Sequence, residues 1–102
     1  MSMPKFNAVV IDARDNVATA IEAIPAGGAA LWSAEGKEAR VICPQEIPIY
    51  HKLAIRDIHE GDFIVKYGWH MGVAAAEIPA GRHVHVHNVK DRRENLEEVG
   101  KQ

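Results

Sequence analysis

The pentapeptide Glu77-Ile78-Pro79-Ala80-Gly81 has two related copies earlier in the chain, Ala23-Ile24-Pro25-Ala26-Gly27 and Asp57-Ile58-His59-Glu60-Gly61. In each copy a glycine follows an isoleucine by three positions. Proline presets φ for the first turn position, and glycine readily adopts the positive φ with which many turns end. Each copy is therefore predicted to form a turn between strands.

Short apolar runs flank these turns and have the composition of strands. Turn signals separate them at intervals of about 8 to 12 residues, which is typical of small all-β domains. The candidate strands are residues 8–11, 29–32, 39–43, 63–67, 71–76 and 83–86. The pattern favours a compact β-barrel or β-clip over alternating βαβ units.

Two short segments are predicted to be helical. Residues 15–24 place apolar side chains at helical spacing, with Asp15 or Asn16 in a capping position and Pro25 after the end. A second short helix is expected after His51, with Leu53, Ala54 and Ile58 on one face. The expected fold class is thus mostly β, a small clip of short strands with one or two short helices.

The composition describes one ordinary globular domain. The chain has 102 residues, of which 47% are hydrophobic and 25% charged, and its net charge of −2 gives no reason to expect a nucleic-acid or anionic-membrane partner. The single cysteine, Cys43, is expected to be buried rather than nucleophilic. No apolar run resembles a secretory signal or a membrane span, so a cytoplasmic protein is expected.

The chain is predicted to divide into a domain over residues 1–89 and a charged C-terminal tail over residues 90–102. The tail is interpreted either as a solvated segment or frayed helix, or as a docking segment. In the second interpretation Leu96 and Val99 would be its apolar contacts.

Histidine is the unusual component, because three of the six histidines alternate along residues 82–88, at His83, His85 and His87. On an extended strand these three rings would project from one face, while Val84 and Val86 would face the core. Alternate histidines are suitable ligands for Zn, Fe or Mn. All three could bind one ion only if the strand bent, so a site is expected to use two of them with further ligands from elsewhere. The alternative is a row of exposed histidines on the polar face of a strand.

The other histidines are weaker candidates, and the remaining chemistry is sparse. His51, followed by Lys52, lies just before a predicted turn, while His59 and His70 are expected in surface turns. The sequence has no glycine-rich phosphate loop, nucleophile elbow or Cys-x-x-Cys pair. A domain this small leaves little room for a deep cleft, so a partner is expected to complete any active site.

Several motifs together resemble a known family. They are residues 15–20 (Asp-Asn-Val-Ala-Thr-Ala), His51-Lys52, Lys66-Tyr67-Gly68 and His83-Val84-His85-Val86-His87-Asn88. Over residues 8–89 the chain resembles the N-terminal SAF-type β-clip domain of the altronate and galactarate dehydratase family, which includes two-subunit sulfolactate sulfo-lyases. Tyr50 departs from the pattern, because the family usually has glycine before His-Lys.

This resemblance implies a subunit or N-terminal domain of a metal-dependent hydro-lyase in sugar-acid metabolism. Such an enzyme removes water from a hexonate or related 2-hydroxy acid to give a 2-keto-3-deoxy acid. The divalent metal is expected to be Fe(II) or Mn(II), and a large dehydratase subunit or C-terminal catalytic domain is the expected partner, without which the chain would be inactive.

Specific roles follow from the strand geometry and the resemblance together. His85, His87 and His51 are the predicted catalytic groups, and His83, His85 and His87 are the predicted metal ligands. Lys52 is predicted to bind the substrate carboxylate and Asn88 to support the site by hydrogen bonding.

Three alternatives remain open. The chain could be a non-catalytic SAF-type module that binds carbohydrate or protein, or the small subunit of a sulfolactate sulfo-lyase. A small metal enzyme that acts alone is disfavoured, because no further Glu or His motif has the usual spacing. Apolar strand edges also allow a homo-oligomer.

Overall fold

The computed structural model describes residues 6–90, and every regular element within them is a β-strand. The strands are β1 (Ala8–Val9), β2 (Val17–Ala20), β3 (Ala29–Ala34), β4 (Lys37–Ile42), β5 (Lys52–Ala54), β6 (Phe63–Lys66), β7 (Trp69–Ala74), β8 (His83–Val84) and β9 (Val89–Lys90). They form a four-stranded sheet in the order β1-β2-β5-β8, a β3–β4 hairpin and a three-stranded sheet in the order β6-β7-β9. The predicted mostly-β fold is confirmed.

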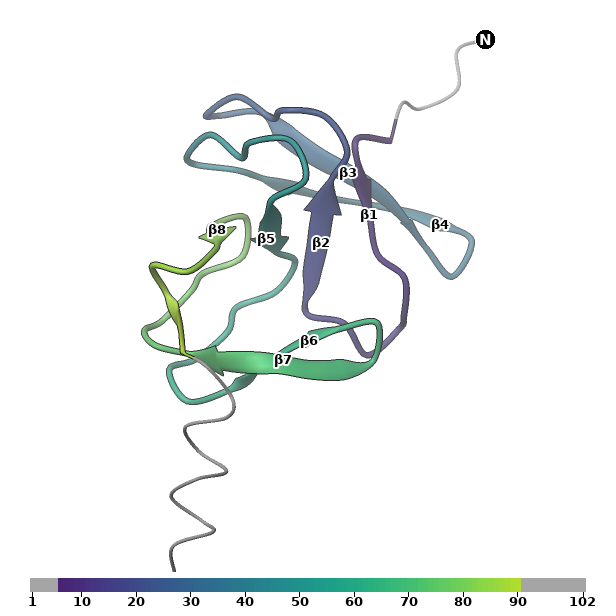
Figure 1. Cartoon of the computed structure of the whole chain (residues 1–102). Coiled ribbons are helices and arrows are strands. Elements are labelled where there is room, and N and C mark those ends of the chain that lie inside the picture. The colour runs from purple at the N-terminus through teal and green to yellow at the C-terminus, as the bar shows by residue number, and fades with distance from the viewer. Residues whose placement is uncertain (1–5, 91–102) are drawn as a thin grey trace, which may run out of the picture.

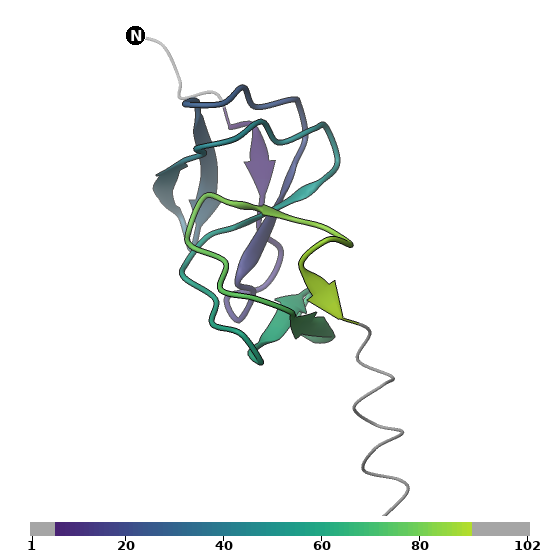
Figure 2. The ribbon, with the colours of Figure 1, turned by 90° about the vertical axis from the view of Figure 1, so that its left-hand side faces the viewer.

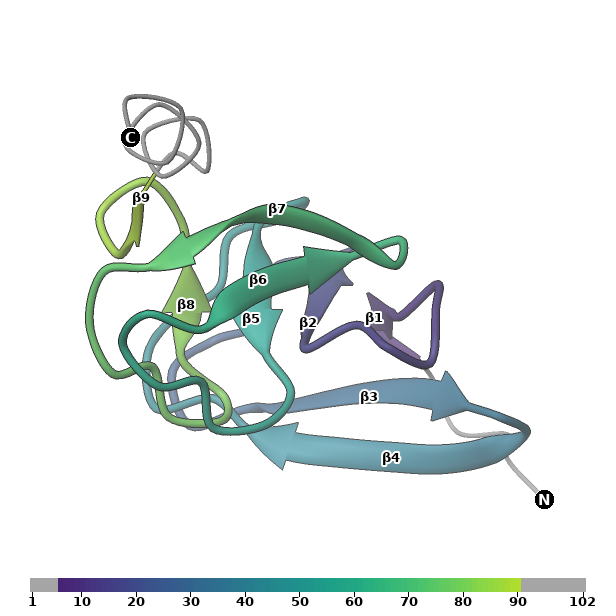
Figure 3. The same cartoon turned by 90° about the horizontal axis from the view of Figure 1, so that it is seen from below.

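The β3–β4 hairpin and a second hairpin, β6–β7, lie at opposite ends of the described domain. Strands β2 and β5 lie between them (Figure 1, and from below in Figure 3). Strand β9 returns to pair with β7, so that the last described residues lie beside the second hairpin (Figure 2). Each end of the molecule has its own core. Ala18 and Ala20 of β2 belong to the core beside β3–β4, whereas Val17 belongs to the core beside β6–β7.

Four isoleucines, rather than three, mark the turns that connect these elements. Ile24 pairs with Ile47, and Ile58 with Ile78, through reciprocal backbone hydrogen bonds of 2.7–2.9 Å. All four side chains are at most 1% exposed. Burying an isoleucine stabilises a fold by about 1.5–3 kcal/mol, so each pair contributes substantially to its core.

A turn follows each isoleucine and has the same form in all four places. The carbonyl group of Pro25, Pro48, His59 or Pro79 accepts a hydrogen bond from the backbone N–H three residues later, at 2.8–3.1 Å. The third residue of each turn has positive φ: Gly27 (85°), Tyr50 (69°), Gly61 (91°) and Gly81 (91°). This φ is that of a type II turn. The predicted turns are confirmed, and in three of the four turns the first residue is a proline.

The helix predicted over residues 15–24 is wrong, because Val17–Ala20 is strand β2. Asp15 and Asn16 do not cap a helix. The Asp15 carboxylate accepts the Gly68 N–H at 2.9 Å, and the Asn16 side chain accepts the Val65 N–H at 2.8 Å. Apolar residues in β2 face a core on both sides of the strand, which hides the alternation typical of a half-exposed strand.

The short helix predicted after His51 is also wrong. Residues Lys52–Ala54 form β5, which pairs with both β2 and β8. His70, expected in a turn, lies in β7, and the turn is formed by Tyr67 and Gly68, which have positive φ of 57° and 75°. Two successive residues with positive φ are typical of a type I′ hairpin turn.

Some sequence predictions concern residues beyond Lys90, which the structure does not describe. Lys90 lies in β9, whereas Leu96 and Val99, the apolar contacts expected in the tail, lie outside the described range. The predicted domain boundary after residue 89 therefore stays a prediction. Within residues 6–90, no helix is present with the length and apolar character required to cross a membrane.

Candidate metal centre

Strands β5 and β8 bring the first two histidines of the candidate site together. They pair antiparallel, with Leu53 opposite His83. His51 directly precedes β5 and His83 begins β8, and each closely follows one of the four turns. The His51 Nδ1 lies 2.8 Å from the His83 Nε2. Only one of these two nitrogens can carry a proton in that contact, and both would have to be unprotonated to hold a metal ion.

A turn after Val84 brings His85 to the same place. The Asn88 N–H donates to the His85 carbonyl group at 3.0 Å. The Asn88 side chain closes the turn, because its Oδ1 accepts the His85 N–H at 3.0 Å and its Nδ2 donates to the His83 carbonyl group at 2.8 Å. The His85 ring consequently stacks on the His51 ring, with 4.3 Å between centroids.

His51, His83 and His85 form a group that could hold a metal ion, since one nitrogen of each lies within 4.8 Å of the others. Two imidazole nitrogens bound to one zinc-like ion at about 2.0–2.1 Å can be at most about 4.2 Å apart. Small side-chain adjustments would therefore suffice. Three neutral imidazoles suit several divalent transition metals, including iron, manganese and zinc. The residues present fit a divalent cation.

The extended histidine strand expected from residues 83–87 is wrong beyond Val84. Strand β8 ends there and residues 85–88 form the turn. Val84 is buried as predicted, but Val86 is 81% exposed rather than facing the core. The bend brings His85 toward His51. The His87 ring lies 5.3 Å from that of His83, but His87 is not among the three residues whose ring nitrogens converge. The converging set thus contains His51 where His87 was predicted.

The surroundings favour unprotonated rings at two of the three positions. Partial burial lowers the pKa of His83, and the neighbouring His51, His87 and His85 lower it further. The pKa of His85 is lowered by loss of solvent and by His51 and Lys52. A neutral ring has a free lone pair, so both residues are prepared to act as ligands near neutral pH.

A hollow of about 430 Å³ opens beside the histidines. Its lining residues are Lys52, Ile64, Met71, His85, Val86, Val89 and Lys90. The pKa of Lys52 is lowered, first by burial and then by the charge of Lys66. Lys52 and the exposed Lys90 thus contribute two basic side chains to the wall of a largely apolar hollow, which is an arrangement suited to a small organic anion.

A β-bulge contributes Met71 to this hollow. The register of β6 and β7 pairs Ile64 with Gly72 and Val65 with His70, which leaves Met71 as an extra residue in β7. Bulges often redirect a side chain beside a functional site. Met71 lines the hollow together with Ile64, whose side chain is buried. The sequence carries no recognisable signal for this residue or for Lys90.

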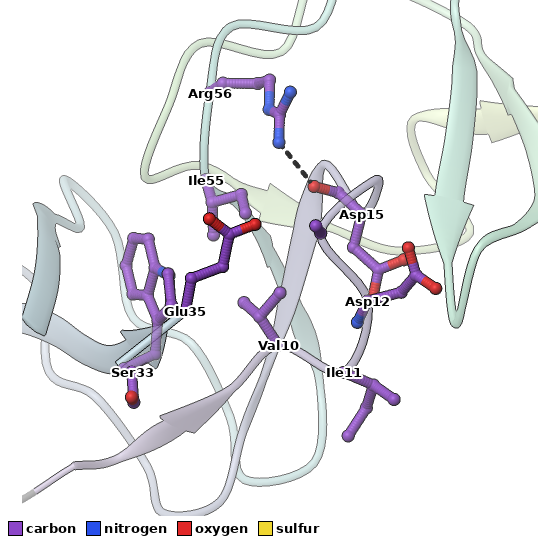
Figure 4. A pocket seen from close by; sticks show the side chains of 11 residues that line it. Val10, Ile11, Asp12, Asp15, Ser33, Glu35, Ile55 and Arg56 are labelled. Atoms are coloured by element: carbon purple, nitrogen blue, oxygen red, sulfur yellow. Dashed lines mark hydrogen bonds between the residues drawn. The ribbon is translucent and has the colours of Figure 1, made fainter. Parts of the chain in front are cut away.

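A second hollow, of about 280 Å³, lies between the β1–β2 loop and the β3–β4 hairpin (Figure 4). Asp15 is part of its wall and is buried, and its backbone carbonyl group accepts a hydrogen bond from Arg56 Nη2 at 2.7 Å. No histidine lines this hollow. Its contacts hold the β1–β2 loop in place, and it does not belong to the histidine site.

The remaining sequence candidates lie apart from the group of three. His59 is exposed in its turn, as predicted, and contacts Glu77 at 2.9 Å. His70 is exposed but lies in β7, where its ring stacks on Phe63. Cys43 is buried as expected, and burial raises the pKa of its thiol.

Comparison with known proteins matches residues 6–92 to the altronate/galactarate dehydratase SAF domain. The chain belongs to this family. Within the chain, the match includes all four turns and every histidine of the candidate site. The resemblance expected from the sequence motifs is confirmed.

Individual relatives carry two kinds of name. The chain is 36% identical over 95 residues to an altronate dehydratase of Escherichia coli, covering 88% of this chain and 17% of that protein. It is 53% identical over 47 residues to a (2R)-sulfolactate sulfo-lyase subunit alpha of Chromohalobacter salexigens, covering 46% of this chain and 50% of that subunit. A (2R)-sulfolactate sulfo-lyase subunit alpha of Paracoccus pantotrophus is 33% identical over 61 residues, which are 60% of this chain and 91% of that subunit.

The SAF-domain chain thus matches half of the first of these subunits and about a sixth of the altronate dehydratase. Its relatives are dehydratases and lyases, so it belongs to a lyase-type enzyme family. Most of the altronate dehydratase has no counterpart in this chain.

Proposed function

We propose that this SAF domain is the small subunit, or a domain, of a metal-dependent sugar-acid dehydratase. One observation carries the proposal: His51 before β5, His83 in β8 and His85 in the following turn converge, with ring nitrogens within 4.8 Å of one another. A set of exposed surface histidines would have no reason to converge in this way. The family match supplies the reaction class, the loss of water from a hexonate or related 2-hydroxy acid.

His51, His83 and His85 would hold a divalent cation, for which Fe(II) and Mn(II) are the first candidates. When bound, the cation supplies Lewis-acid stabilisation of negative charge on the substrate oxygens. The chain itself fixes the three rings, because the β5–β8 pairing holds two of them and the turn closed by Asn88 holds the third.

The lysines beside the histidines would bind the acid group of the substrate. Lys52 and Lys90 line the same hollow as His85, and that hollow is otherwise apolar. An ammonium group beside an apolar surface attracts a carboxylate more strongly than one that is fully surrounded by water. This arrangement agrees with the role expected for Lys52. Both ends of the Asn88 side chain bond to the turn, which is the contact pattern of a supporting residue.

Proton transfer would be divided between this domain and its partner. His87 is exposed at the edge of the group, where it can exchange protons with solvent without giving up a place among the three converging rings. Among residues 6–90, those that line the hollow include no carboxylate that could act as a base. The larger chain would supply that base, and the SAF domain alone would be inactive.

The test compares two samples. One is the purified chain alone, and the other is the purified chain mixed with a large dehydratase chain encoded beside its gene. Both samples are assayed on altronate, galactarate, related sugar acids and sulfolactate, with and without Fe(II) or Mn(II). Turnover of a sugar acid by the mixture alone, dependent on metal, supports the proposal. A complex that turns over nothing would favour the non-catalytic binding module.

A second candidate is the small subunit of a sulfolactate sulfo-lyase. The supporting observation is that this chain covers 91% of the subunit alpha from Paracoccus pantotrophus. Sulfolactate carries two acid groups, and the hollow presents two lysines, Lys52 and Lys90. Release of sulfite from sulfolactate in the same assay, without turnover of any sugar acid, would select this candidate.

A further inference from the structure

Exposed apolar side chains border the hollow beside the histidines. Met71 and Val86 line it, and Trp69 is the partner in β7 of Lys66, which influences Lys52 in the wall of the hollow. Val86 is 81% exposed and Trp69 is 70% exposed. We call Trp69, Met71 and Val86 the apolar rim. Tryptophan and methionine are enriched at protein interfaces, and exposed apolar groups gathered beside a functional hollow indicate a surface that is covered in use.

The site enclosed by this rim carries an excess of positive charge. Lys52 and Lys90 line the hollow, and the charge of Lys66 reaches Lys52. The three converging ligands are all imidazoles, with no carboxylate in their group among residues 6–90. A bound divalent cation would add two further positive charges. A surface that closes over this site must therefore contribute negative charge.

We infer that the apolar rim is the surface on which the larger dehydratase chain docks, and that this chain faces the site with carboxylate side chains. The inference rests on the proposed function. The occupant follows from the relatives: the matching segment forms only 17% of the altronate dehydratase, and the sulfo-lyase relatives are named as subunits. The rest of such an enzyme has to meet this domain at some surface.

A second copy of this chain fits the rim less well. In a two-fold symmetric contact each surface meets itself, so the lysines of one copy would face those of the other. Like charges placed together across an interface disfavour the contact. A partner with apolar side chains and carboxylates satisfies both the rim and the charge of the hollow.

The test measures the dissociation constant between the full chain and the large dehydratase chain encoded beside its gene, by sedimentation velocity. The variant is the triple substitution Trp69→Ser, Met71→Ser and Val86→Ser. The matched control is Ile11→Ser, since Ile11 is 62% exposed but lines the other hollow. Circular dichroism and Co(II) binding check that each variant is folded with its histidine site intact.

We expect the triple variant to raise the dissociation constant at least about 30-fold, as loss of an interface hot spot does, and the control to change it less than about three-fold. Binding of the unaltered chain should weaken as salt is raised, because carboxylates face lysines. Binding that the rim variant leaves unchanged would overturn the inference, as would a large loss caused by Ile11→Ser alone.

The same samples separate this inference from the proposed function. A complex that depends on the rim but turns over no acid supports the docking surface while removing the dehydratase assignment. An active complex whose affinity is unchanged by the rim substitutions supports the dehydratase assignment and overturns the docking surface. Self-association of the isolated chain that the triple variant abolishes, without any complex with the large chain, would assign the rim to a second copy and overturn the inference.

Discussion

The His51 Nδ1 lies 2.8 Å from the His83 Nε2, although the two residues are 32 positions apart in the chain. The pairing of β5 with β8 fixes this contact, and the turn after Val84 adds His85 to it. If the three rings bind one metal ion, removal of any of them should weaken metal binding.

Replacing His51 or His83 with alanine should weaken binding of Co(II), used as a spectroscopic probe, at least about 100-fold. Loss of groups that merely orient metal ligands already costs about 10–100-fold, so loss of a ligand should cost more. His87→Ala is the matched control, because His87 is not among the three residues whose ring nitrogens converge, and it should change affinity less than about ten-fold. Equal losses for His87→Ala and His51→Ala would contradict the assigned ligand set.

Asn88 should act on the metal through the turn. Asn88→Ala removes both of its side-chain bonds to the backbone of His83 and His85 and should lower Co(II) affinity by about 10–100-fold. Asn88→Asp retains an oxygen acceptor for the His85 N–H and should give an intermediate loss. The order is checked by titration of folded variants, and an unchanged affinity in Asn88→Ala would remove the supporting role.

The metal-free protein should lose stability as the pH falls below about 6.5, the ordinary pKa of histidine. The pKa values of His83 and His85 are lowered in the folded state, so protons bind the unfolded chain more tightly. The loss of folding stability is absent above the pKa of histidine in the unfolded chain. It grows as the pH falls, until the pH lies below the pKa values of His83 and His85 in the folded state. Urea unfolding at pH 7.5 and 5.5 should show this decrease, and His83→Gln should reduce it.

His59 serves as the comparison, because its pKa is shifted in the opposite direction to those of His83 and His85. Its hydrogen bond to Glu77 raises its pKa, so its contribution is complete below about pH 6.5 and is lost as the pH rises through the raised value. His59→Gln should therefore leave the loss of stability at acidic pH in place. If it abolished that loss instead, the assignment to His83 and His85 would fail.

Tyr50→Gly should stabilise the domain by about 1 kcal/mol. Tyr50 has a φ of 69°, a left-handed conformation that costs a residue with a Cβ atom about 1–2 kcal/mol and costs glycine little. Tyr50→Ala keeps the Cβ atom and should bring no such gain. Urea denaturation of both variants measures the difference, and a gain of equal size in Tyr50→Ala would show that strain is not its cause.

Thr19→Val should also stabilise the domain, by about 1 kcal/mol. The Thr19 hydroxyl group is buried without a hydrogen-bond partner among the described residues, and valine has the same shape without the polar group. Thr19 pairs with Lys52 across β2 and β5. A loss of stability in Thr19→Val would indicate that the hydroxyl group has a partner in solution.

Much of the fold could be predicted from the repeated turn sequence, because an isoleucine followed three residues later by a glycine combines a core residue with a turn ending. The same motif does not predict the fourth turn, because Tyr50 stands where the other copies have glycine. The false helix over residues 15–24 had a different cause. Strand β2 is buried on both faces, so its sequence lacks the alternation that distinguishes a strand.

The candidate site was predictable in composition but not in geometry. The alternating histidines indicated a cluster, and Lys52 lies beside it as expected. The bend after Val84 depends on the tertiary contacts of Asn88, which the alternating pattern does not reveal. The bulge that directs Met71 into the hollow depends on the register between β6 and β7, and a single strand sequence does not specify a register.

The separation of His51 and His83 along the chain has a consequence for folding. An ion bound by both would join two residues 32 positions apart, and folding has already met the entropic cost of bringing them together. Because the unfolded chain lacks the preformed site, cation loading and folding would become linked equilibria. Chelation would then shift the melting temperature of the whole domain, rather than only emptying a surface site.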